Sequence, residues 1–574
     1  MKKNQFVEYS KGLKLKAVLA PLFKLLEAIL ELLIPLIIAD IIDIGIKNND
    51  KEYIIIRFLY LIGFAILGFL CAVVAQYFSS KVASTYSCRL RKGLFEHVQG
   101  LSYKDLDELG TSTILTRLTG DINQIQTGIN MFLRLFLRSP FIFLGALIMS
   151  LFVDFQMGLI FLVAIIILSF IVVIIMKITL PKYKIIQNNL DQVTKETKES
   201  LTGARIIRAF TNEEKQIKTF DQKNDNYAKL QNKVSKISIL MNPLTLFVIN
   251  LLVIFVLYFG GVKVDTGTLT NGQVVALYNY TNYILVELIK FANLVITITK
   301  ALVCTRRVGI LLEKESSLQF KDSIKINNDF LSFNNVDFKY YENGKEALKD
   351  INFKIEKNQT LGIIGGTGAG KSTIVNLIGH NYNLTNGSII FDGYNIESYS
   401  LKALRNRIGI VPQKAVLFEG TIRSNLLVGN KNATDDELIE ALKISQAISI
   451  INKKELGLDE KVEQGGRNFS GGEKQRLTIA RALVKKPDLL ILDDSSSALD
   501  FKTDKDLRAE LSKIDNMSVI IVSQRTSALL NCDKILVLDH GYIVDAGTHQ
   551  ELLERCGLYQ DIHYSQFEKE LTIN

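Results

Sequence analysis

The 574-residue chain combines 48% hydrophobic residues with 22% charged residues. This apolar content excludes an intrinsically disordered chain, and 37 glycines, 7 prolines and 5 cysteines exclude a collagen or a disulfide scaffold. The positive charge is concentrated in residues 1–310, which hold 35 Lys and Arg against 22 Asp and Glu, whereas the remainder is slightly acidic. Beside apolar segments, the positive-inside preference explains this excess better than nucleic-acid binding, so we expect no nucleic-acid partner.

Three long runs without charge dominate the first half of the chain. Residues 58–80, 157–176 and 237–262 are each long enough to cross about 30 Å of hydrocarbon as a helix. The alternative, a buried helix of a soluble protein, rarely requires runs of this length. Weaker apolar segments at about residues 15–45, 132–153 and 272–299 carry some charges, and together the six segments predict a six-span membrane domain.

The connections between these spans predict the orientation of the chain. Residues 81–131 and 177–236 are long and basic, and with Lys2 and Lys3 they favour the cytoplasm. An even number of spans returns the second half to the cytoplasm, so we expect a multi-pass protein of the plasma membrane. The long loops are rich in helix formers, which predicts helices that continue well beyond the bilayer.

A polar stretch over residues 313–328 reads as a linker, so we assign residues 1–312 to the transmembrane domain and 329–574 to an α/β nucleotide-binding domain. Within the second domain, a strand, a Gly-rich turn and a helix follow one another in "LGIIGGTGAGKSTIVNLIG". The turn matches the P-loop pattern G-x-x-x-x-G-K-[ST], which wraps phosphates with backbone N–H groups. The predicted ATP-binding residues are Gly365, Gly366, Thr367, Gly368, Ala369, Gly370, Lys371, Ser372 and Thr373.

Two further features complete the predicted phosphate site. Lys371 is expected to neutralise the β- and γ-phosphates, and the Ser372 hydroxyl to bind Mg²⁺. The apolar run at residues 489–492 ends in Asp493, a carboxylate suited to holding the water shell of Mg²⁺ at the end of a buried strand. In the sequence between the P-loop and Asp493, Ser470 precedes a strongly helical segment. The N–H groups at the start of this helix could bind phosphate, or Ser470 could simply be an ordinary N-cap.

With these motifs, the whole chain resembles a half-transporter of the ATP-binding cassette (ABC) exporter type. The resemblance implies that Tyr340 stacks on adenine, that Gln413 in the Q-loop contacts Mg²⁺, and that ATP and Mg²⁺ are the ligands. It implies that Ser470, Gly471, Gly472 and Glu473 form the signature that contacts the partner's ATP, and that Ser497, Ala498, Leu499 and Asp500 form the D-loop. Stretches within both long loops, "LSYKDLDELGTSTILTRLTGD" and "ESLTGARIIRAFTNEE", resemble the coupling-helix regions of exporters.

Three positions depart from the family pattern. Asp494 stands where a catalytic Glu is usual, Gln524 where the switch His is usual, and Glu473 where the signature usually has Gln. Asp is one methylene shorter than Glu, and Gln cannot carry a proton, so we expect tight ATP binding with slow hydrolysis. A heterodimer with a second half-transporter that supplies Glu and His follows as the preferred interpretation. A homodimer in which Asp494 still acts as the base and an ATP-gated regulatory or channel subunit are the alternatives.

Charged residues within the spans suggest where cargo binds. We predict that Glu27, Glu31 and Glu287 line a cavity that favours a small cationic amphiphile; the alternative is that they pair with lysines or lie at the membrane interface. The sequence does not separate drug, lipid and peptide cargo. His380, His540, His549 and His563 are predicted to lie at the surface or in turns, and the five cysteines to be free thiols.

Overall fold

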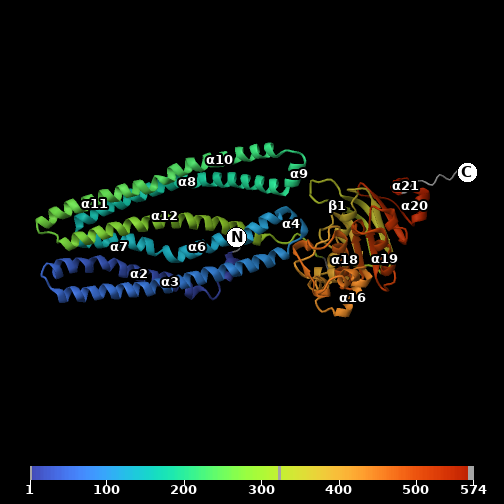
Figure 1. Cartoon of the computed structure of the whole chain (residues 1–574), viewed down its shortest axis with the longest axis horizontal. Helices are drawn as coiled ribbons and strands as arrows, with labels where there is room; N and C mark the ends of the chain where they lie inside the picture. Colours follow the sequence, from blue (N-terminus) through green and yellow to red (C-terminus); the bar gives the residue numbers. More distant parts are fainter. Residues whose placement is uncertain (1–2, 321–324, 567–574) are drawn as a thin grey trace. The chain divides into compact units, whose positions relative to one another are not determined.

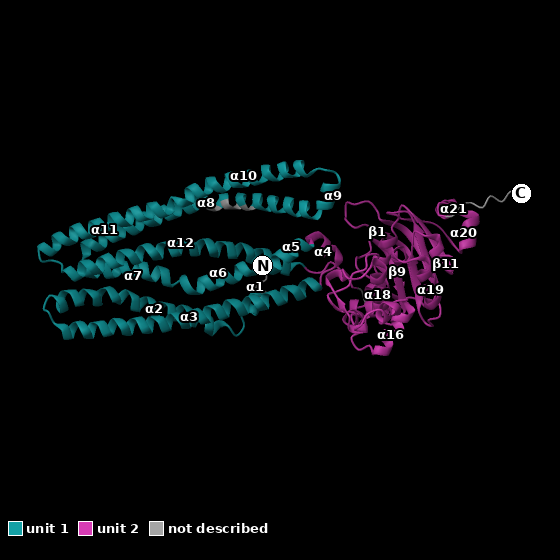
Figure 2. Cartoon of the chain, viewed as in Figure 1, with its two compact units in different colours: residues 1–99, 111–314 teal, residues 100–110, 315–574 magenta. Residues whose placement is uncertain are grey.

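The computed structural model of the chain describes residues 3–320 and 325–566; parts of the predicted linker and of the C-terminal end lie outside these ranges. The chain divides into two compact units (Figure 2). The first comprises residues 1–99 and 111–314, and the second residues 100–110 and 315–574. The second unit therefore includes a short stretch of the first long loop.

The first unit is built from helices (Figure 1). Its α-helices are α1 (Lys3–Tyr9), α2 (Lys14–Asp40), α3 (Lys51–Gln99), α5 (Thr111–Thr116), α6 (Ile122–Leu135), α7 (Arg138–Val153), α8 (Phe155–Thr202), α9 (Ala204–Ala209), α10 (Glu213–Ile239), α11 (Met241–Asp265) and α12 (Asn271–Glu313). Two short π-helical segments, Ile41–Ile46 and Arg117–Asp121, adjoin α2 and α6.

Several of these helices are much longer than a membrane is thick. The helices α3, α8 and α12 contain 49, 48 and 43 residues. At about 1.5 Å per residue each exceeds the roughly 30 Å of hydrocarbon about twofold. The prediction that helices continue well beyond the bilayer is confirmed.

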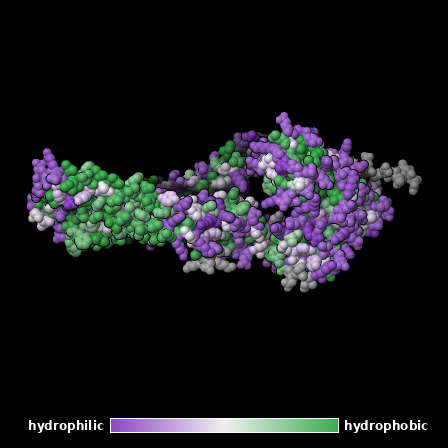
Figure 3. Space-filling model, turned by 90° about the horizontal axis from the view of Figure 1, so that it is seen from below, coloured by the Kyte–Doolittle hydropathy of each residue, from purple (hydrophilic) through white to green (hydrophobic). Residues whose placement is uncertain are grey.

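Five helical segments of the described chain, rather than the six predicted, are long and apolar enough to cross a membrane: Lys51–Gln99, Thr111–Val153, Phe155–Thr179, Glu213–Asp265 and Asn271–Glu313. The missing one is the first predicted span, which corresponds to α2. This helix carries Lys24, Glu27 and Glu31 within its apolar stretch. Figure 3 shows hydrophobic side chains gathered over one stretch of the helical unit, as a lipid-facing surface requires, with hydrophilic side chains at its tip and over the rest of its visible face.

The third predicted span, residues 132–153, is broken near its start. The helix α6 ends at Leu135 and α7 begins at Arg138, with a turn between them. Pro140 explains the break, because it has no N–H to bond to the carbonyl group four residues earlier and its ring clashes there, whereas the first turn of a new helix tolerates proline. The break starts a new helix at Arg138, four residues after Arg134.

The second unit holds a P-loop type α/β core. Its strands are β1 (Leu331–Phe338), β2 (Leu348–Ile355), β3 (Thr360–Gly365), β4 (Asn386–Phe391), β5 (Tyr394–Asn395), β6 (Ile408–Val411), β7 (Gly420–Thr421), β8 (Lys461–Val462), β9 (Leu489–Asp493), β10 (Ser518–Val522), β11 (Lys534–Asp539) and β12 (Tyr542–Gly547). Its helices are α4 (Tyr103–Leu109), α13 (Lys371–Ile378), α14 (Leu401–Arg407), α15 (Ile422–Leu426), α16 (Asp435–Ile444), α17 (Ile448–Asn452), α18 (Gly471–Leu483), α19 (Phe501–Leu511), α20 (His549–Arg555) and α21 (Gly557–Tyr564).

The strands form two main sheets. The larger has the order β12-β11-β3-β10-β9-β6, in which all neighbours are parallel except β11 and β12. The smaller, β2-β1-β4-β5, is antiparallel. In β3, Leu361 and Ile363 pack into one hydrophobic core and Ile364 into the other, so β3 is covered on both faces. The predicted fold class, a helical membrane domain followed by an α/β P-loop domain, is confirmed.

Candidate functional site

The P-loop connects the central strand β3 to α13. Gly368 and Gly370 adopt φ of 83° and 103°, a region that L-residues rarely occupy. A Cβ at Gly370 would lie 2.6 Å from a methyl carbon of Leu348 and 3.0 Å from the Ala347 carbonyl oxygen, so there is little space for a side chain here. The loop therefore turns its backbone tightly into the N-terminus of α13, which favours anions.

Lys371 lies within this loop and is 9% exposed. Its Nζ donates hydrogen bonds to the carbonyl oxygens of Gly365, at 2.8 Å, and of Gly366, at 2.7 Å. Burial lowers the pKa of Lys371, while the nearby carboxylates of Asp494 and Asp493 oppose this shift. The only formal cation on the loop is thus held over the phosphate-binding turn.

Ser372 and Asp493 come together although they are 121 residues apart, with the Ser372 hydroxyl donating to Oδ1 of Asp493 at 3.2 Å. Burial raises the pKa of Asp493, and the Asp494 carboxylate raises it further, against the hydrogen bond from Ser372. Within the described ranges no group of three or more His, Cys, Asp or Glu could hold a metal ion. A hydroxyl and one carboxylate nevertheless fit Mg²⁺, which keeps several waters and takes few protein oxygen ligands beside a nucleotide.

Asp494 follows β9 in a left-handed backbone conformation, with φ 46° and ψ 33°. Its N–H donates to the carbonyl oxygen of Val522 at 2.9 Å, which fixes it beside the end of β10. Its carboxylate Oδ2 accepts a hydrogen bond of 3.1 Å from Nε2 of Gln413. The structure thus brings two of the three predicted catalytic residues into contact.

Gln524, the third, is an exposed residue in the loop that follows β10. Its backbone is held by α21 and the residues after it: Gln566 Nε2 donates to the Gln524 carbonyl oxygen at 2.8 Å, and the Thr526 N–H donates to Gln566 Oε1 at 3.1 Å. His563 Nδ1 lies 2.9 Å from the Thr526 hydroxyl. Sequence reasoning missed Gln566, because no motif links residues this close to the C-terminus to the switch loop.

His380 and His549 are more buried than the sequence predicted. His380 lies in a turn, as predicted, but is 1% exposed rather than at the surface, and burial lowers its pKa. His549 is half-buried, with Nδ1 2.7 Å from the Tyr559 hydroxyl, while His540 is exposed in a turn. The prediction of free cysteines is confirmed for all five.

Tyr340, the predicted adenine-stacking residue, is half-buried after the end of β1. Its hydroxyl lies 3.0 Å from that of Thr373, the second residue after Lys371. Its ring meets Phe338 and Tyr382 edge-on, with centroids 4.8 and 5.3 Å away. The aromatic side chain is therefore anchored next to the P-loop helix.

The predicted signature forms the N-terminus of α18. Ser470 is its N-cap and makes a capping box with Glu473: the Glu473 N–H donates to Ser470 Oγ at 3.3 Å, and the Ser470 N–H to Glu473 Oε2 at 2.8 Å. The hydrogen bond that the Ser470 N–H donates to the Glu473 carboxylate lowers the pKa of Glu473. A Cβ at Gly472 would lie 3.1 Å from the Ala498 carbonyl oxygen, so the signature adjoins the D-loop. No hydrogen bond of the described residues joins the signature to the P-loop.

The predicted D-loop leads from the end of β9 into α19. The Ser497 hydroxyl donates to the Asp494 carbonyl oxygen at 2.8 Å, and Leu499 is buried. Asp500 caps α19 by accepting hydrogen bonds from the Thr503 N–H, at 2.9 Å, and its hydroxyl, at 2.7 Å. The D-loop is thus connected directly to the residue that follows β9.

The helix α4, from the first stretch that resembles a coupling region, belongs to the second unit. The Tyr382 hydroxyl donates to Asp107 Oδ2 at 2.7 Å, and burial together with this bond raises the pKa of Tyr382. The Ser317 N–H donates to Asp105 Oδ2 at 2.9 Å. The second such stretch contains α9, which has no buried residue and exposes Ile206 and, just beyond it, Phe210.

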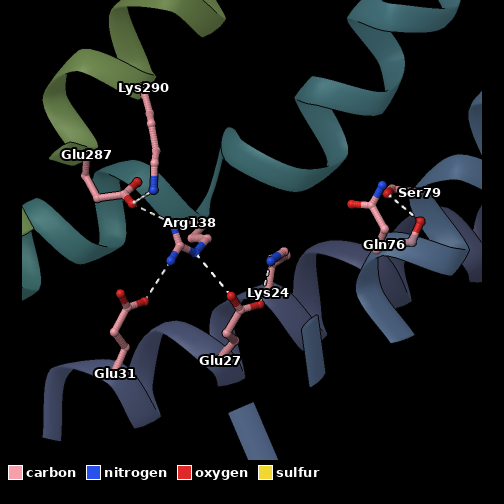
Figure 4. A network of polar contacts seen from close by, with 8 residues as sticks. All are labelled: Lys24, Glu27, Glu31, Gln76, Ser79, Arg138, Glu287 and Lys290. Carbon is pink, nitrogen blue, oxygen red and sulfur yellow. Dashed lines mark hydrogen bonds and ion pairs between the residues drawn. The ribbon is translucent and has the colours of Figure 1, made fainter. Parts of the chain in front are cut away.

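The three glutamates of the predicted cargo cavity surround one arginine (Figure 4). Arg138 Nη1 lies 2.5 Å from Glu287 Oε1, its Nη2 lies 2.7 Å from Glu31 Oε2, and its Nε lies 3.8 Å from Glu27 Oε1. Lys290 pairs with Glu287 at 2.8 Å and Lys24 with Glu27 at 2.6 Å. The sequence-based alternative, pairing with lysines, describes these residues better than free acidic groups do, although Arg138 is the central partner.

Comparisons with known proteins cover nearly the whole chain. Residues 18–288 match the family model described as "ABC transporter transmembrane region", and residues 348–497 match the model described as "ABC transporter". A Bacillus subtilis protein, "Uncharacterized ABC transporter ATP-binding protein YfiB", is 34% identical over 568 residues, 98% of each chain. The "ATP-dependent lipid A-core flippase" of Escherichia coli K12 is 30% identical over 531 residues, 92% of this chain and 91% of that one.

A solved structure shows the same fold. "Structure of a bacterial Atm1-family ABC exporter with ATP bound" superimposes with a TM-score of 0.83 at 24% sequence identity, covering 97% of this chain and 99% of that chain. The likeness extends through both units.

Proposed function

The chain belongs to the ABC transporter family and has the architecture of an ATP-driven exporter, and from this premise we propose that it is a half-transporter whose own ATP site binds nucleotide firmly but hydrolyses it slowly. The observation that carries the proposal is the pair of residues at the ends of β9 and β10. In this proposal Asp494, which follows β9, would orient the attacking water, and Gln524, in the loop after β10, would contact the γ-phosphate. The groups that bind phosphate remain complete.

Binding of ATP uses the residues of the P-loop. Backbone N–H groups of residues 365–373 surround the phosphates, Lys371 neutralises the β- and γ-oxygens, and Tyr340 offers its ring to adenine. Ser372, Asp493 through water, and Gln413 would hold Mg²⁺. The metal, when bound, supplies positive charge that offsets the charge developing on the transferred phosphoryl group.

Hydrolysis requires a water that is oriented for in-line attack on the γ-phosphate. The Asp494 carboxylate is one methylene shorter than a glutamate, and its Oδ2 is engaged by Gln413. A displacement of about 1 Å can cost about 100-fold in rate. Gln524 can donate a hydrogen bond but carries neither a charge nor a transferable proton. Both changes lower hydrolysis more than binding.

In this proposal a second half-transporter completes the exporter. In this proposal the N-terminus of α18, capped by Ser470, faces the nucleotide of the partner, where its backbone N–H groups bind phosphate. The exposed apolar side chains of Ile206 and Phe210 support a second subunit, because no part of the described chain covers them. A partner that carries Glu and His would hold the competent site, and this heterodimer is our preferred assembly.

The cargo in this proposal is a lipid-like or drug-like amphiphile. The membrane unit offers long apolar helices, and one relative that is 30% identical is named a lipid A-core flippase. Export of an amphiphile from the membrane would match both observations.

Flux in inside-out vesicles tests the proposal. This chain is co-expressed with a candidate partner half-transporter, and uptake of a fluorescent amphiphile is followed after ATP addition. We expect ATP-dependent uptake that is reduced strongly by Lys371→Ala, with Lys357→Ala, an exposed lysine of the same unit, as the matched control. Equal uptake with the wild-type chain, the Lys371→Ala variant and no ATP would contradict the proposal, and full flux by this chain alone would favour a homodimer.

A further inference from the structure

Arg134 and Arg138 lie four residues apart on either side of the break in the third span, yet their surroundings differ. Arg138 is 8% exposed and faces three carboxylates. Arg134, in the last turn of α6, has no ion pair in the described part of the chain; its buried Nε has no hydrogen-bond partner, which is also true of the Nε of Arg138. A cation in a membrane helix costs about 2.5–3.5 kcal/mol near the bilayer centre, so such groups usually have a compensating partner or a function.

The charges around these arginines do not balance. Four cations, Lys24, Arg134, Arg138 and Lys290, are accompanied by three carboxylates, Glu27, Glu31 and Glu287. All three carboxylates are already engaged by Arg138, Lys24 or Lys290 (Figure 4). The carbonyl groups at the end of α6 compensate Arg134 only in part. The cluster is therefore short of one negative charge, and the excess positive charge is on Arg134.

Arg134 opens into a groove rather than into packed protein. Together with Lys24 of α2 it lines a cavity of ≈ 490 Å³ against α3. The α3 wall is mainly apolar and aromatic, and consists of Phe69, Ala72, Val73, Gln76 and Tyr77. Of these, Phe69, Val73 and Tyr77 are at least 49% exposed. The groove thus combines a cationic side with a hydrocarbon-like side.

We propose that this groove binds an anionic amphiphile, whose phosphate or carboxylate head pairs with Arg134 and whose hydrocarbon lies along Phe69, Val73 and Tyr77. A guanidinium offers a planar pair of N–H donors that matches a phosphate or carboxylate, and it is less strongly hydrated than an ammonium. The apolar wall selects a membrane-soluble ligand over a free anion. The inference deepens the proposed function, on which it rests for the subsequent transport of the ligand, and it reverses the sign of the cargo that Glu27 and Glu31 suggested.

The apolar segments of a second copy, within the described residues, offer no spare carboxylate for the groove. The runs 58–80, 132–153, 157–176 and 237–262 contain no Asp or Glu, and the segment 272–299 contains only Glu287. In α2, Glu27 and Glu31 contact Arg138, and Asp40 pairs with Arg57. The missing negative charge is therefore better supplied by a ligand than by a neighbouring helix of the same sequence.

Lipid titration of the full-length purified chain tests the proposal without ATP. Native mass spectrometry measures binding of dioleoyl phosphatidic acid and of dioleoyl phosphatidylcholine to the wild-type protein and to Arg134→Gln, Arg134→Lys and Arg57→Gln variants. Arg57 is a matched control because it is also a membrane-unit arginine but pairs with Asp40 at 3.1 Å. We expect Arg134→Gln to weaken phosphatidic acid binding at least about tenfold and Arg57→Gln to leave it within about threefold of wild type. Arg134→Lys, which keeps the charge but loses the planar pair of donors, should fall between the two.

A second variant and a competition experiment test the two parts of the groove separately. Val73→Glu places a carboxylate in the groove while Arg134 remains, and it should weaken phosphatidic acid binding as Arg134→Gln does. Inorganic phosphate should not compete, because it lacks hydrocarbon. Equal affinity for both lipids, or unchanged phosphatidic acid binding in Arg134→Gln and Val73→Glu, would overturn the proposal; competition by phosphate would overturn its lipid part. Because binding is measured without ATP, a failure of flux would count against the proposed function and leave this result standing.

Discussion

Gln413 and Asp494, 81 residues apart, meet through a hydrogen bond of 3.1 Å from Nε2 to Oδ2 at the end of β9. The contact joins the predicted Q-loop residue to the residue that we propose as the catalytic base. It holds one oxygen of a carboxylate that is already shorter than glutamate, which leaves the other oxygen as the acceptor for an attacking water. The slow hydrolysis that we propose follows from this geometry.

Restoring the longer side chain should raise turnover. We expect Asp494→Glu combined with Gln524→His to increase the ATPase rate about 10–100-fold, because the carboxylate advances by about one methylene and the switch residue gains a titratable group. The measurement is phosphate release at saturating ATP by protein in lipid nanodiscs. Asp494→Asn is the control and should lower the rate further. An unchanged rate in the double variant, with and without a partner, would count against an impaired site.

Gln566 should be a positioning residue that holds the backbone of the switch loop. Its side chain bonds to the backbone of Gln524 and of Thr526, the residues before and after Arg525. Gln566→Ala removes the acceptor for the Thr526 N–H, so hydrogen exchange at this amide should become faster. Gln560→Ala is the matched control, since Gln560 donates to the Leu553 carbonyl oxygen and does not touch the switch loop. Unchanged exchange in Gln566→Ala would mean that the loop is held by other contacts.

The Arg138 cluster should stabilise the membrane unit. Glu287, 3% exposed, also accepts a hydrogen bond from the Ser139 hydroxyl at 2.7 Å. We expect Glu287→Ala to destabilise the protein by about 3–5 kcal/mol, because Arg138 loses a buried partner. Thermal unfolding in detergent provides the comparison, and the more exposed Lys290→Ala should have a much smaller effect. Equal unfolding temperatures for Glu287→Ala and wild type would show that the cluster does not stabilise the fold.

Cysteine labelling tests the packing of the nucleotide-binding unit. Burial raises the pKa of Cys532 to about 12, whereas Cys88 is exposed. Because the thiolate is the reactive form, roughly one part in 10⁴ of Cys532 is reactive at pH 8, and its labelling should increase only as the pH approaches 12. Iodoacetamide should therefore modify Cys88 in the folded protein and Cys532 only after unfolding. Comparable rates for the two residues, with Cys88→Ser identifying the sites, would contradict this.

The phosphate site could be anticipated because its residues occur in short contiguous motifs. The pattern around Lys371 fixes a turn between a strand and a helix, and Asp493 ends a run that suits a buried strand. The contact between Ser372 and Asp493 follows once both strands lie in one parallel sheet. Each of these short patterns therefore predicts its local backbone structure without knowledge of distant contacts.

Contacts between segments far apart in the sequence could not be predicted in this way. Helical spacing showed that Glu27 and Glu31 share a face, but not that Arg138 from another helix would pair with both and with Glu287. Counting charges also made α2 look like a weak span, although its charges are compensated inside the fold. The contacts of Gln566 with the switch loop depend on the path of the chain around α21, and hydrophobic periodicity does not predict that path.

Slow hydrolysis at this chain's own site is best tested by the ATP turnover of the purified chain without any partner. We expect saturable ATP binding together with an ATPase rate that is barely above that of Lys371→Ala, and a clear increase when a partner with Glu and His at the corresponding positions is added. Rapid ATP hydrolysis by the chain alone, abolished by Asp494→Asn, would contradict it.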